Sequence, residues 1–281
     1  MSTNQNPENC NHNCDNCAAN CGERESGPQS FRVEANPRSS IKKMIGIVSG
    51  KGGVGKSFVT SILATHMTKK GYHCAILDGD ITGPSIGKAF GIHEKANGDG
   101  ELIFPAQTKT GIQVISANML LEDETQPIIW RGPLVAGILK QFYQEVLWKN
   151  VDYMFVDMPP GTGDVPLTAF QSLPLDGIVI VTTPQELVGM IVEKAINMAK
   201  MMNIPILGVV ENMSYVECGK CGENIYVFGK SHLDETAEKY GLPILGRIPL
   251  REETALASDE GNIEDILVPE IFAAVDVIES I

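Results

Sequence analysis

Eight consecutive residues near the start of the chain, Gly50 to Ser57, combine glycines, two lysines and a serine in an order suited to phosphate. They contain the pattern G-x-x-x-x-G-K-[ST], the phosphate-binding loop or P-loop. Its glycines let consecutive backbone N–H groups turn inward around a β-phosphate, while Lys56 neutralises the β/γ charge and the Ser57 hydroxyl is placed to reach Mg²⁺. A glycine-rich turn that matches by chance is the alternative. We therefore expect nucleotide to be bound by Gly50, Lys51, Gly52, Gly53, Val54, Gly55, Lys56 and Ser57.

Carboxylates follow two further apolar runs. Asp157 ends the run 153–156 and precedes the segment Pro-Pro-Gly-Thr-Gly-Asp at 159–164. A carboxylate at the end of a parallel strand next to a P-loop holds the Mg²⁺ shell, although an ordinary strand-ending Asp is the alternative. Asp78 and Asp80 lie two residues apart at a strand end and therefore point the same way, so they can bracket one water and one metal. The alternative there is an Asp-Gly turn with solvated acids.

A pair of cysteines, Cys218 and Cys221, lies in a glycine-flanked turn late in the chain. Two thiolates at C-x-x-C chelate one edge of a metal centre, and a tetrahedral set needs two more ligands. The economical solution is a symmetric dimer in which both copies donate their pair to a site on the two-fold axis. A structural zinc knuckle or a redox dithiol are the alternatives, and spacing does not distinguish zinc from a [4Fe-4S] cluster.

The amino-terminal segment holds four more thiolates in a short polar stretch, at Cys10, Cys14, Cys17 and Cys21. A chain with so little to pack has little structural reason for them except ligation of one metal centre. A [4Fe-4S] cluster, zinc with His12 as a spare ligand, and a transient metal-delivery arm all fit this pattern. The remaining cysteine, Cys74, lies in an apolar run and is most simply a small buried hydrophobe.

Alternating apolar runs and helical stretches must position these groups. Runs with β-rich composition are expected to form strands at 44–49, 73–77, 112–116, 153–156, 177–182, 206–210 and 244–248. Helices are expected at 57–70, 133–148, 187–202 and 233–240. This alternation predicts an α/β fold with a doubly wound, mostly parallel sheet and helices on both faces, whose ligands bind at the carboxyl ends of the strands. We expect a flexible, cysteine-rich metal-binding segment at 1–40 and one ATPase domain at 41–281.

Composition limits the classes of partner. The 281 residues carry a formal net charge of -13, which argues against a broad nucleic-acid surface because duplex binding needs clustered Lys and Arg. No apolar run approaches the ~18 residues of a membrane span, and the polar amino terminus has no signal-peptide core. Clustered cysteines in such a chain indicate metal ligation more than disulfides. We expect a cytoplasmic protein that binds neither nucleic acid nor membrane.

The combination of motifs resembles one protein family closely. The chain carries K-G-G-V-G-K-S, L-D-G-D-x-x-G-P-S, D-x-P-P-G-T-G-D, E-N-M and C-x-x-C between about residues 41 and 270. Lys51 is similar to the extra lysine of the deviant Walker A ATPases, a family that includes the MinD and ParA positioning proteins and nitrogenase iron protein. With the cysteine pair added, the chain resembles the Mrp/ApbC group of iron-sulfur carriers, also called nucleotide-binding proteins.

The resemblance implies specific roles. Lys51 would reach a nucleotide across a homodimer interface, Asp80 would orient the attacking water, and Asp78 would support the Mg²⁺ shell. The segment after Asp157 would be switch II, and Asn212 would contact adenine, although spacing alone fits a capping Asn equally well. Segments 130–133 and 183–186 also resemble the family and are expected near the dimer face or the switches. The implied catalytic residues are Lys51, Lys56 and Asp80, and the implied magnesium ligands are Ser57, Asp78 and Asp157.

Two classes of function compete at this point. The leading hypothesis is a slow, switch-like homodimeric ATPase that carries a [4Fe-4S] cluster at Cys218 and Cys221 and transfers it to apo-proteins. The alternative is a MinD/ParA-like positioning ATPase with structural zinc at the dimer interface. That alternative predicts a basic or amphipathic carboxyl-terminal anchor, whereas residues 263–281 are acidic. A nitrogenase-like electron donor would split its ligands between two distant segments, unlike this paired C-x-x-C.

Overall fold

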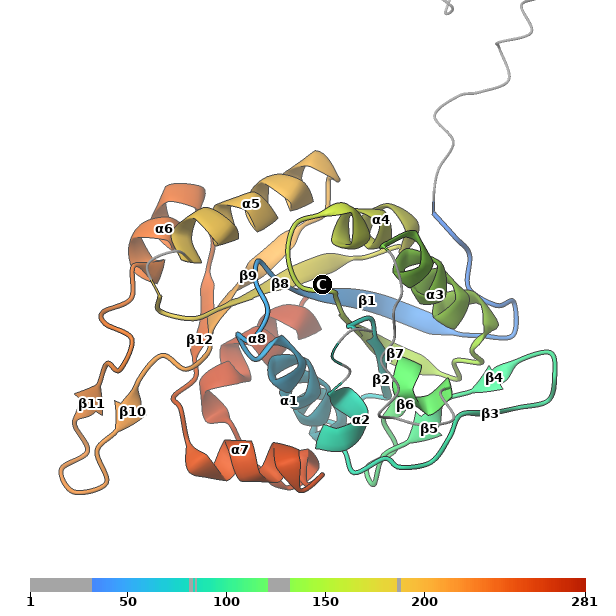
Figure 1. Ribbon diagram of the computed structural model, residues 1–281, viewed down its shortest axis with the longest axis horizontal. Coiled ribbons are helices and arrows are strands. Elements are labelled where there is room, and N and C mark those ends of the chain that lie inside the picture. The colour runs from blue at the N-terminus through green and yellow to red at the C-terminus, as the bar shows by residue number, and fades with distance from the viewer. Residues whose placement is uncertain (1–31, 81–82, 84, 121–131, 186–187) are drawn as a thin grey trace, which may run out of the picture. The chain divides into compact units, whose positions relative to one another are not determined.

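The structure is a computed structural model, and it describes residues 32–80, 83, 85–120, 132–185 and 188–281. The chain divides into two units, Met1–Phe31 and Arg32–Ile281. All the described residues belong to the second unit. Its centre is an eight-stranded sheet with the strand order β12-β9-β8-β1-β7-β2-β6-β5 (Figure 1).

The central sheet is parallel except at one edge, as the sequence predicts. Its parallel strands are β1 (Ile41–Ser49), β2 (Cys74–Asp78), β6 (Gln113–Ile115), β7 (Val151–Asp157), β8 (Gly177–Thr182), β9 (Ile206–Glu211) and β12 (Ile244–Arg247). The edge strand β5 (Ala106–Gln107) pairs antiparallel with β6. Two small hairpins lie outside this sheet, β3 (Asn97–Gly98) with β4 (Ile103–Phe104) and β10 (Val216–Glu217) with β11 (Asn224–Ile225).

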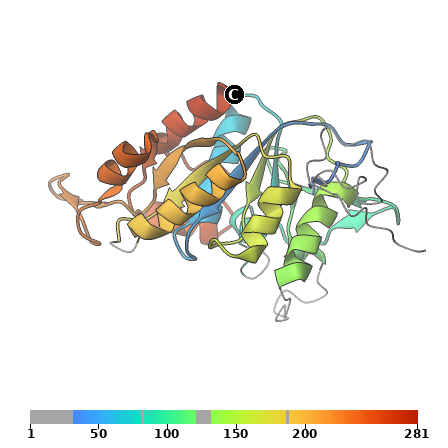
Figure 2. The same ribbon diagram turned by 90° about the horizontal axis from the view of Figure 1, so that it is seen from above.

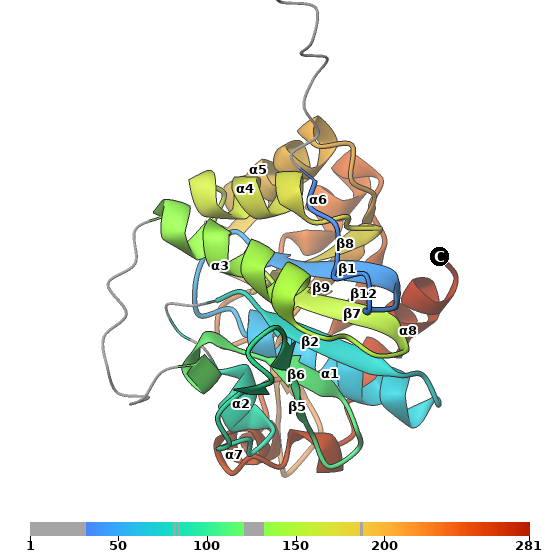
Figure 3. The same ribbon diagram turned by 90° about the vertical axis from the view of Figure 1, so that its right-hand side faces the viewer.

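Helices cover both faces of the sheet. Figures 2 and 3 show α3 (Gly132–Glu145), α4 (Asp164–Ser172), α5 (Val188–Met201) and α6 (Leu233–Tyr240) on one face. The other face carries α1 (Lys56–Lys69), α2 (Ile86–Ala89), α7 (Glu252–Asp259) and α8 (Phe272–Glu279). Short 3₁₀ turns occupy Ala117–Leu120, Ile263–Asp265 and Pro269–Ile271. Because both faces are covered, the central strands are largely apolar, and every residue of β8 is buried.

Strand register brings the expected chemistry to one edge of the sheet. In β1, Ile47 pairs with Asp157 at the end of β7, and in β2 Asp78 pairs with the same Asp157. The loop after β1 therefore begins beside the carboxylates that end β2 and β7. This is the carboxyl edge of the parallel strands, where an α/β sheet binds its ligands.

Four helices of the described residues lie where the sequence analysis expected none: α2, α4, α7 and α8. The helix α4 begins within the glycine-rich segment 159–164, whose composition indicates a loop. The acidic tail includes α8, which packs on α1, and two of its carboxylates pair with a lysine at the end of α1. Lys70 Nζ lies 3.0 Å from Asp276 and 2.6 Å from Glu279. Two of the acidic residues of the tail therefore form ion pairs with Lys70 at the end of α1.

The described residues just before β1, 33–40, are attached to the domain by hydrogen bonds. The Val33 amide donates to the Ser172 carbonyl over 2.9 Å, and the Ser40 amide donates to the Trp148 carbonyl over 2.8 Å. The Trp148 amide in turn donates to Ser39 Oγ over 2.9 Å. Within the part of the chain that the structure describes, no helix is long and apolar enough to span a membrane.

Candidate functional site

The phosphate-binding pattern forms the loop between β1 and α1. Gly53 and Gly55 have φ angles of 78° and 81°, in the left-handed region that favours glycine. A Cβ atom on Gly55 would lie only 2.1 Å from Asn212 Nδ2. The second glycine of the pattern is therefore required both by the backbone conformation and by the close approach of a side chain from the end of β9.

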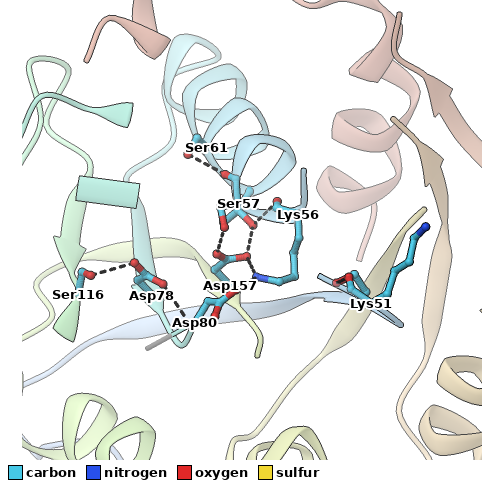
Figure 4. A network of polar contacts seen from close by, with 10 residues as sticks. Lys51, Lys56, Ser57, Ser61, Asp78, Asp80, Ser116 and Asp157 are labelled. Atoms are coloured by element: carbon cyan, nitrogen blue, oxygen red, sulfur yellow. Dashed lines mark hydrogen bonds and ion pairs between the residues drawn. The ribbon is translucent and has the colours of Figure 1, made fainter. Parts of the chain in front are cut away.

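Asp157 is the centre of a buried polar network at the start of α1 (Figure 4). Lys56 Nζ donates to Asp157 Oδ1 over 2.6 Å, and Ser57 Oγ donates to Asp157 Oδ2 over 2.5 Å. Thr60, one turn further along α1, places its hydroxyl 3.0 Å from Asp157 Oδ1. Asp157 is fully buried and Lys56 is 5% exposed, so this ion pair lies in a medium that screens it weakly.

A second and a third carboxylate lie beside this ion pair. Asp80 Oδ2 is 3.6 Å from Lys56 Nζ. Asp78 accepts hydrogen bonds from Ser116 Oγ over 2.9 Å and from the backbone amide of Asp80 over 3.1 Å. Burial, and then the charge of Asp157, raise the pKa of Asp78 to about 8. The predicted Asp78, Asp80 and Asp157 therefore meet around one lysine.

A cavity of about 380 Å³ opens above this network. Its walls include the glycines of the P-loop together with Lys56, Ser57 and Asp80. Further out it is bounded by Lys88 of α2 and Asp259 of α7, whose side chains form an ion pair of 2.7 Å. The cavity is within the size range of ligand sites, roughly 300–1,000 Å³.

The other lysine of the loop points elsewhere. Figure 4 shows Lys51 directed away from Lys56 and Asp157. Its Nζ donates a hydrogen bond to Gln185 Oε1, in the segment after β8 that the sequence analysis placed near the dimer face or the switches. In the single chain, Lys51 is therefore held by its own chain and takes no part in the network around Asp157.

Asn212 lies against the P-loop from the end of β9. Its Nδ2 donates to the Val54 carbonyl over 3.0 Å, and its backbone amide donates to the Thr182 carbonyl over 2.8 Å. The side chain is 5% exposed. The structure thus places the predicted adenine ligand beside the nucleotide loop, and the contact with adenine itself stays a prediction.

These groups fit a magnesium nucleotide. Mg²⁺ prefers hard oxygen ligands and keeps several waters, so it needs only one or two protein oxygens. The Ser57 hydroxyl and the Asp157 carboxylate lie next to each other at the end of β7, and Lys56 lies beside them, where it can bind the phosphates.

Sequence reasoning missed Thr60 and Ser116. Thr60 lies four residues after Lys56, so helical spacing alone would have placed both on one face of α1.

The C-x-x-C pair lies in the turn between β10 and β11. The Cys218 amide donates to the Glu223 carbonyl over 2.9 Å, and the Gly222 amide donates to the Cys218 carbonyl over 2.8 Å. Hydrogen bonds from the backbone amides of Lys220 and Cys221 lower the pKa of the Cys218 thiol. Cys221 is exposed. A turn that stabilises thiolate and leaves sulfur accessible is suited to metal ligation.

The pair supplies only part of a metal site. Among the residues that the structure describes, no group of three or more His, Cys, Asp or Glu side chains could hold a metal ion. Two thiolates alone leave a tetrahedral centre half-coordinated. Cys10, Cys14, Cys17 and Cys21, the other predicted metal ligands, lie outside the described residues.

Known proteins resemble this chain over most of its length. A family described as the NUBPL iron-transfer P-loop NTPases, of the ParA group, matches residues 40–276. The iron-sulfur cluster carrier protein of Clostridium perfringens is 48% identical over 80% of this chain and 82% of its own length. Its counterpart in Methanocaldococcus jannaschii is 46% identical over 83% of this chain and 81% of its own length.

Solved structures agree with this assignment. The nucleotide-binding protein of Archaeoglobus fulgidus, solved with ADP, has a TM-score of 0.74 and 43% identity, covering 83% of this chain and 91% of that one. MinD of Pyrococcus furiosus has a TM-score of 0.61 but 19% identity, covering 85% of this chain and 98% of its own, and so shares the fold alone. The alternative of a MinD-like protein is therefore not favoured. The chain belongs to the NUBPL iron-transfer family of P-loop NTPases.

Proposed function

We propose that this protein hydrolyses ATP and carries an iron-sulfur cluster, which it delivers to apo-proteins. The observation that carries the proposal is the incomplete cysteine site: the half-buried Cys218, whose thiolate the turn stabilises, and the exposed Cys221 offer half of a ligand set. The named carrier relatives, at 46–48% identity, support iron-sulfur as the cargo. The cargo would be a [4Fe-4S] cluster, and zinc is the other metal that such a turn accepts.

A second copy of the chain is the economical source of the missing ligands. A two-fold axis beside the turn would bring together two equivalent cysteine pairs and complete a four-thiolate site. The apolar run after Cys221 supports a partner at this place. Ile225, Tyr226, Val227 and Phe228 are between 39% and 58% exposed in the single chain, and such contiguous apolar surface marks interaction sites. The protein would thus act as a homodimer.

The nucleotide would lie in the cavity above Asp157. Lys56 and the P-loop amides would hold the phosphates, and Lys51 would reach the nucleotide of the second copy. Bound Mg²⁺, held by Ser57 and Asp157 and supported by Asp78, would draw charge from the phosphates during hydrolysis. Asp80, whose carboxylate borders the cavity, would orient the attacking water, and Asn212 would contact adenine.

Nucleotide binding would reorganise the network described above. Lys56 and the Ser57 hydroxyl both donate hydrogen bonds to Asp157, so a bound phosphate would compete with Asp157 for the lysine. Asp157 ends β7 and leads directly into the segment 158–164. A change in the contacts of Asp157 would therefore move this switch segment, which links the nucleotide state to dimer geometry and cluster release.

Residues 1–40 would form a metal-binding segment with Cys10, Cys14, Cys17 and Cys21 as ligands of a cluster or of zinc, and 41–281 the ATPase domain. We expect cytoplasmic action on apo-protein clients without nucleic acid or membrane.

Anaerobic reconstitution with iron and sulfide tests the proposal. The protein should gain an iron-sulfur absorption band, and Cys218→Ser or Cys221→Ser should remove the part of it bound at this turn. Cys74→Ser is the matched control, because Cys74 is buried and burial raises its thiol pKa to about 12. Uptake of zinc alone would contradict iron-sulfur carriage at Cys218 and Cys221. So would an iron-sulfur absorption band that survives both substitutions in a protein lacking residues 1–31.

A further inference from the structure

Thr60 belongs to the network around Asp157 but has no role in the proposed function. It lies one turn after Lys56 in α1 and is fully buried. Its Oγ1 lies 3.0 Å from Asp157 Oδ1 and 3.0 Å from the backbone carbonyl oxygen of Lys56. Lys56 and Ser57 line the nucleotide cavity, whereas Thr60 does not. Thr60 therefore contacts Asp157 from a position that the nucleotide does not reach.

The Thr60 hydroxyl has one proton for two acceptors. A threonine hydroxyl donates a single hydrogen bond, so it cannot fully serve the Lys56 carbonyl and the Asp157 carboxylate at the same time. The bond to the carbonyl is the ordinary local contact of a threonine inside a helix. The bond to Asp157 is the stronger one when its acceptor is ionised. The proton can thus turn toward Asp157 whenever the carboxylate lacks another donor.

Asp157 would lack such a donor once nucleotide is bound. Its Oδ1 accepts from Lys56 Nζ over 2.6 Å and from Thr60, and its Oδ2 accepts from Ser57 over 2.5 Å. In the proposed function Lys56 turns to the phosphates, which removes the charged donor from Oδ1. Ser57 can stay on Oδ2, because a hydroxyl can donate its proton while its oxygen lone pairs contact a metal. A fully buried carboxylate oxygen that keeps no donor bears the whole cost of its desolvation.

We propose that Thr60 is a positioning residue, whose hydroxyl takes over Asp157 Oδ1 when Lys56 turns to the phosphates. One donor from α1 would then hold each oxygen of the carboxylate, Thr60 on Oδ1 and Ser57 on Oδ2. This two-point contact fixes the rotation of the carboxyl group, so Asp157 stays charged and directed toward the Mg²⁺ shell. Removing a residue that orients a metal ligand in this way typically costs about 10–100-fold in metal affinity. The inference deepens the proposed binding of magnesium nucleotide and rests on it.

A purely structural role for Thr60 has a different consequence. If the hydroxyl only supported α1 through the Lys56 carbonyl, its loss would weaken the fold equally with and without nucleotide. Thr65 provides the comparison, because it is fully buried on the same helix and its Oγ1 has no hydrogen-bond partner among the described residues. Thr65→Val is therefore the matched control for Thr60→Val.

Calorimetric binding of adenylyl imidodiphosphate, an ATP analogue that resists hydrolysis, tests the proposal on the full chain in Mg²⁺. Thr60→Val keeps the shape of the side chain and removes the hydroxyl, and should weaken binding about tenfold or more, the value of one hydrogen bond to a charged group. Thr60→Ser keeps the donor and Thr65→Val leaves the network intact, so both should bind within about threefold of the unsubstituted protein. Without nucleotide, the thermal midpoint of Thr60→Val should lie within about 4 °C of that of Thr65→Val, because Lys56 still holds Oδ1.

A double-mutant cycle with Lys56→Met imitates the withdrawal of the lysine without any nucleotide. In Lys56→Met, Asp157 Oδ1 depends on the Thr60 hydroxyl. Thr60→Val should therefore lower the folding equilibrium constant, measured with urea, about tenfold more in Lys56→Met than in the unsubstituted protein. Thr65→Val should show no such coupling to Lys56→Met. Thr60→Ala removes the hydroxyl with a better helix former and gives the same tests if Thr60→Val fails to fold.

Unchanged analogue binding in Thr60→Val would overturn the proposal, and so would binding by Thr60→Ser that is equally weak. Additive effects of Thr60→Val and Lys56→Met on the folding equilibrium would also overturn it. Failure of the unsubstituted protein to bind the analogue would instead refute the proposed nucleotide site, and the inference with it. The two failures are distinguishable, because only the second one affects the unsubstituted protein.

Discussion

The buried charges around Lys56 make the nucleotide-free protein sensitive to loss of that lysine. Lys56→Met would remove the one described cation that lies within 4 Å of Asp157 and Asp80, at 2.6 Å and 3.6 Å. Breaking a buried ion pair by removing one partner costs about 3–5 kcal/mol. For a domain of this size, such a loss lowers the thermal midpoint by about 6–20 °C.

Replacing the other partner of the ion pair, Asp157, should lower the stability less than replacing Lys56. In Asp157→Asn, Lys56 keeps Asp80 as a partner at 3.6 Å, and Asp78 loses the neighbouring charge that helps to raise its pKa. We expect a loss of about 1–3 kcal/mol, comparable to an impaired buried hydrogen-bond network. Thermal unfolding followed by circular dichroism, without nucleotide or Mg²⁺, measures both variants.

The matched control is a half-exposed ion pair on the same strand that leads into the P-loop. Lys43 Nζ lies 3.4 Å from Asp176, and the two side chains are 37% and 34% exposed. Lys43→Met should therefore change stability by about 1 kcal/mol or less. Equal destabilisation by Lys56→Met and Asp157→Asn, or a Lys56→Met variant as stable as Lys43→Met, would refute the reasoning.

Three further predictions follow from single contacts. Gly55→Ala should lower the free energy of unfolding by about 2 kcal/mol or more, because the residue has a positive φ of 81° and a Cβ there would clash with Asn212. A Cβ at Gly52 meets open space, so Gly52→Ala should change the free energy of unfolding, measured with urea, by no more than about 1 kcal/mol. Gln185→Ala frees the second P-loop lysine and should tighten ATP-dependent dimerisation about two- to tenfold by ultracentrifugation; weaker dimerisation would contradict the role of this contact. Burial lowers the pKa of His66, so protonation favours the unfolded state and the free energy of unfolding falls as the pH drops below about 6.5. In His66→Gln this free energy should fall less steeply with pH. An identical pH profile for the variant and the unsubstituted protein would contradict this role of His66.

The parts of the site that share one edge of the sheet could be predicted from sequence. A P-loop, a strand-ending Asp157 and the pair Asp78 and Asp80 each follow an apolar run, and parallel strands bring such ends together. The seven expected strands of the central sheet are confirmed, with ends that move by a few residues. The antiparallel edge strand β5, only two residues long, gives too little periodicity to detect.

Features that depend on tertiary contact were beyond sequence reasoning. The glycines and prolines at 159–164 indicate a loop, yet α4 begins at Asp164. The carboxylates of α8 look like a solvated acidic face until α1 brings Lys70 against them. No spacing rule connects Lys51 with Gln185, because this contact joins segments far apart in the sequence.

The stoichiometry of cluster binding tests most directly the claim that two copies share one metal centre. A chain lacking residues 1–31 would be loaded anaerobically, and its mass, iron and labile sulfide measured together by light scattering and chemical analysis. The account predicts a dimer with about four iron atoms per two chains, and loss of both iron and loaded dimer in Cys218→Ser. A monomer that holds a full cluster, or a dimer whose iron survives Cys218→Ser, would contradict it.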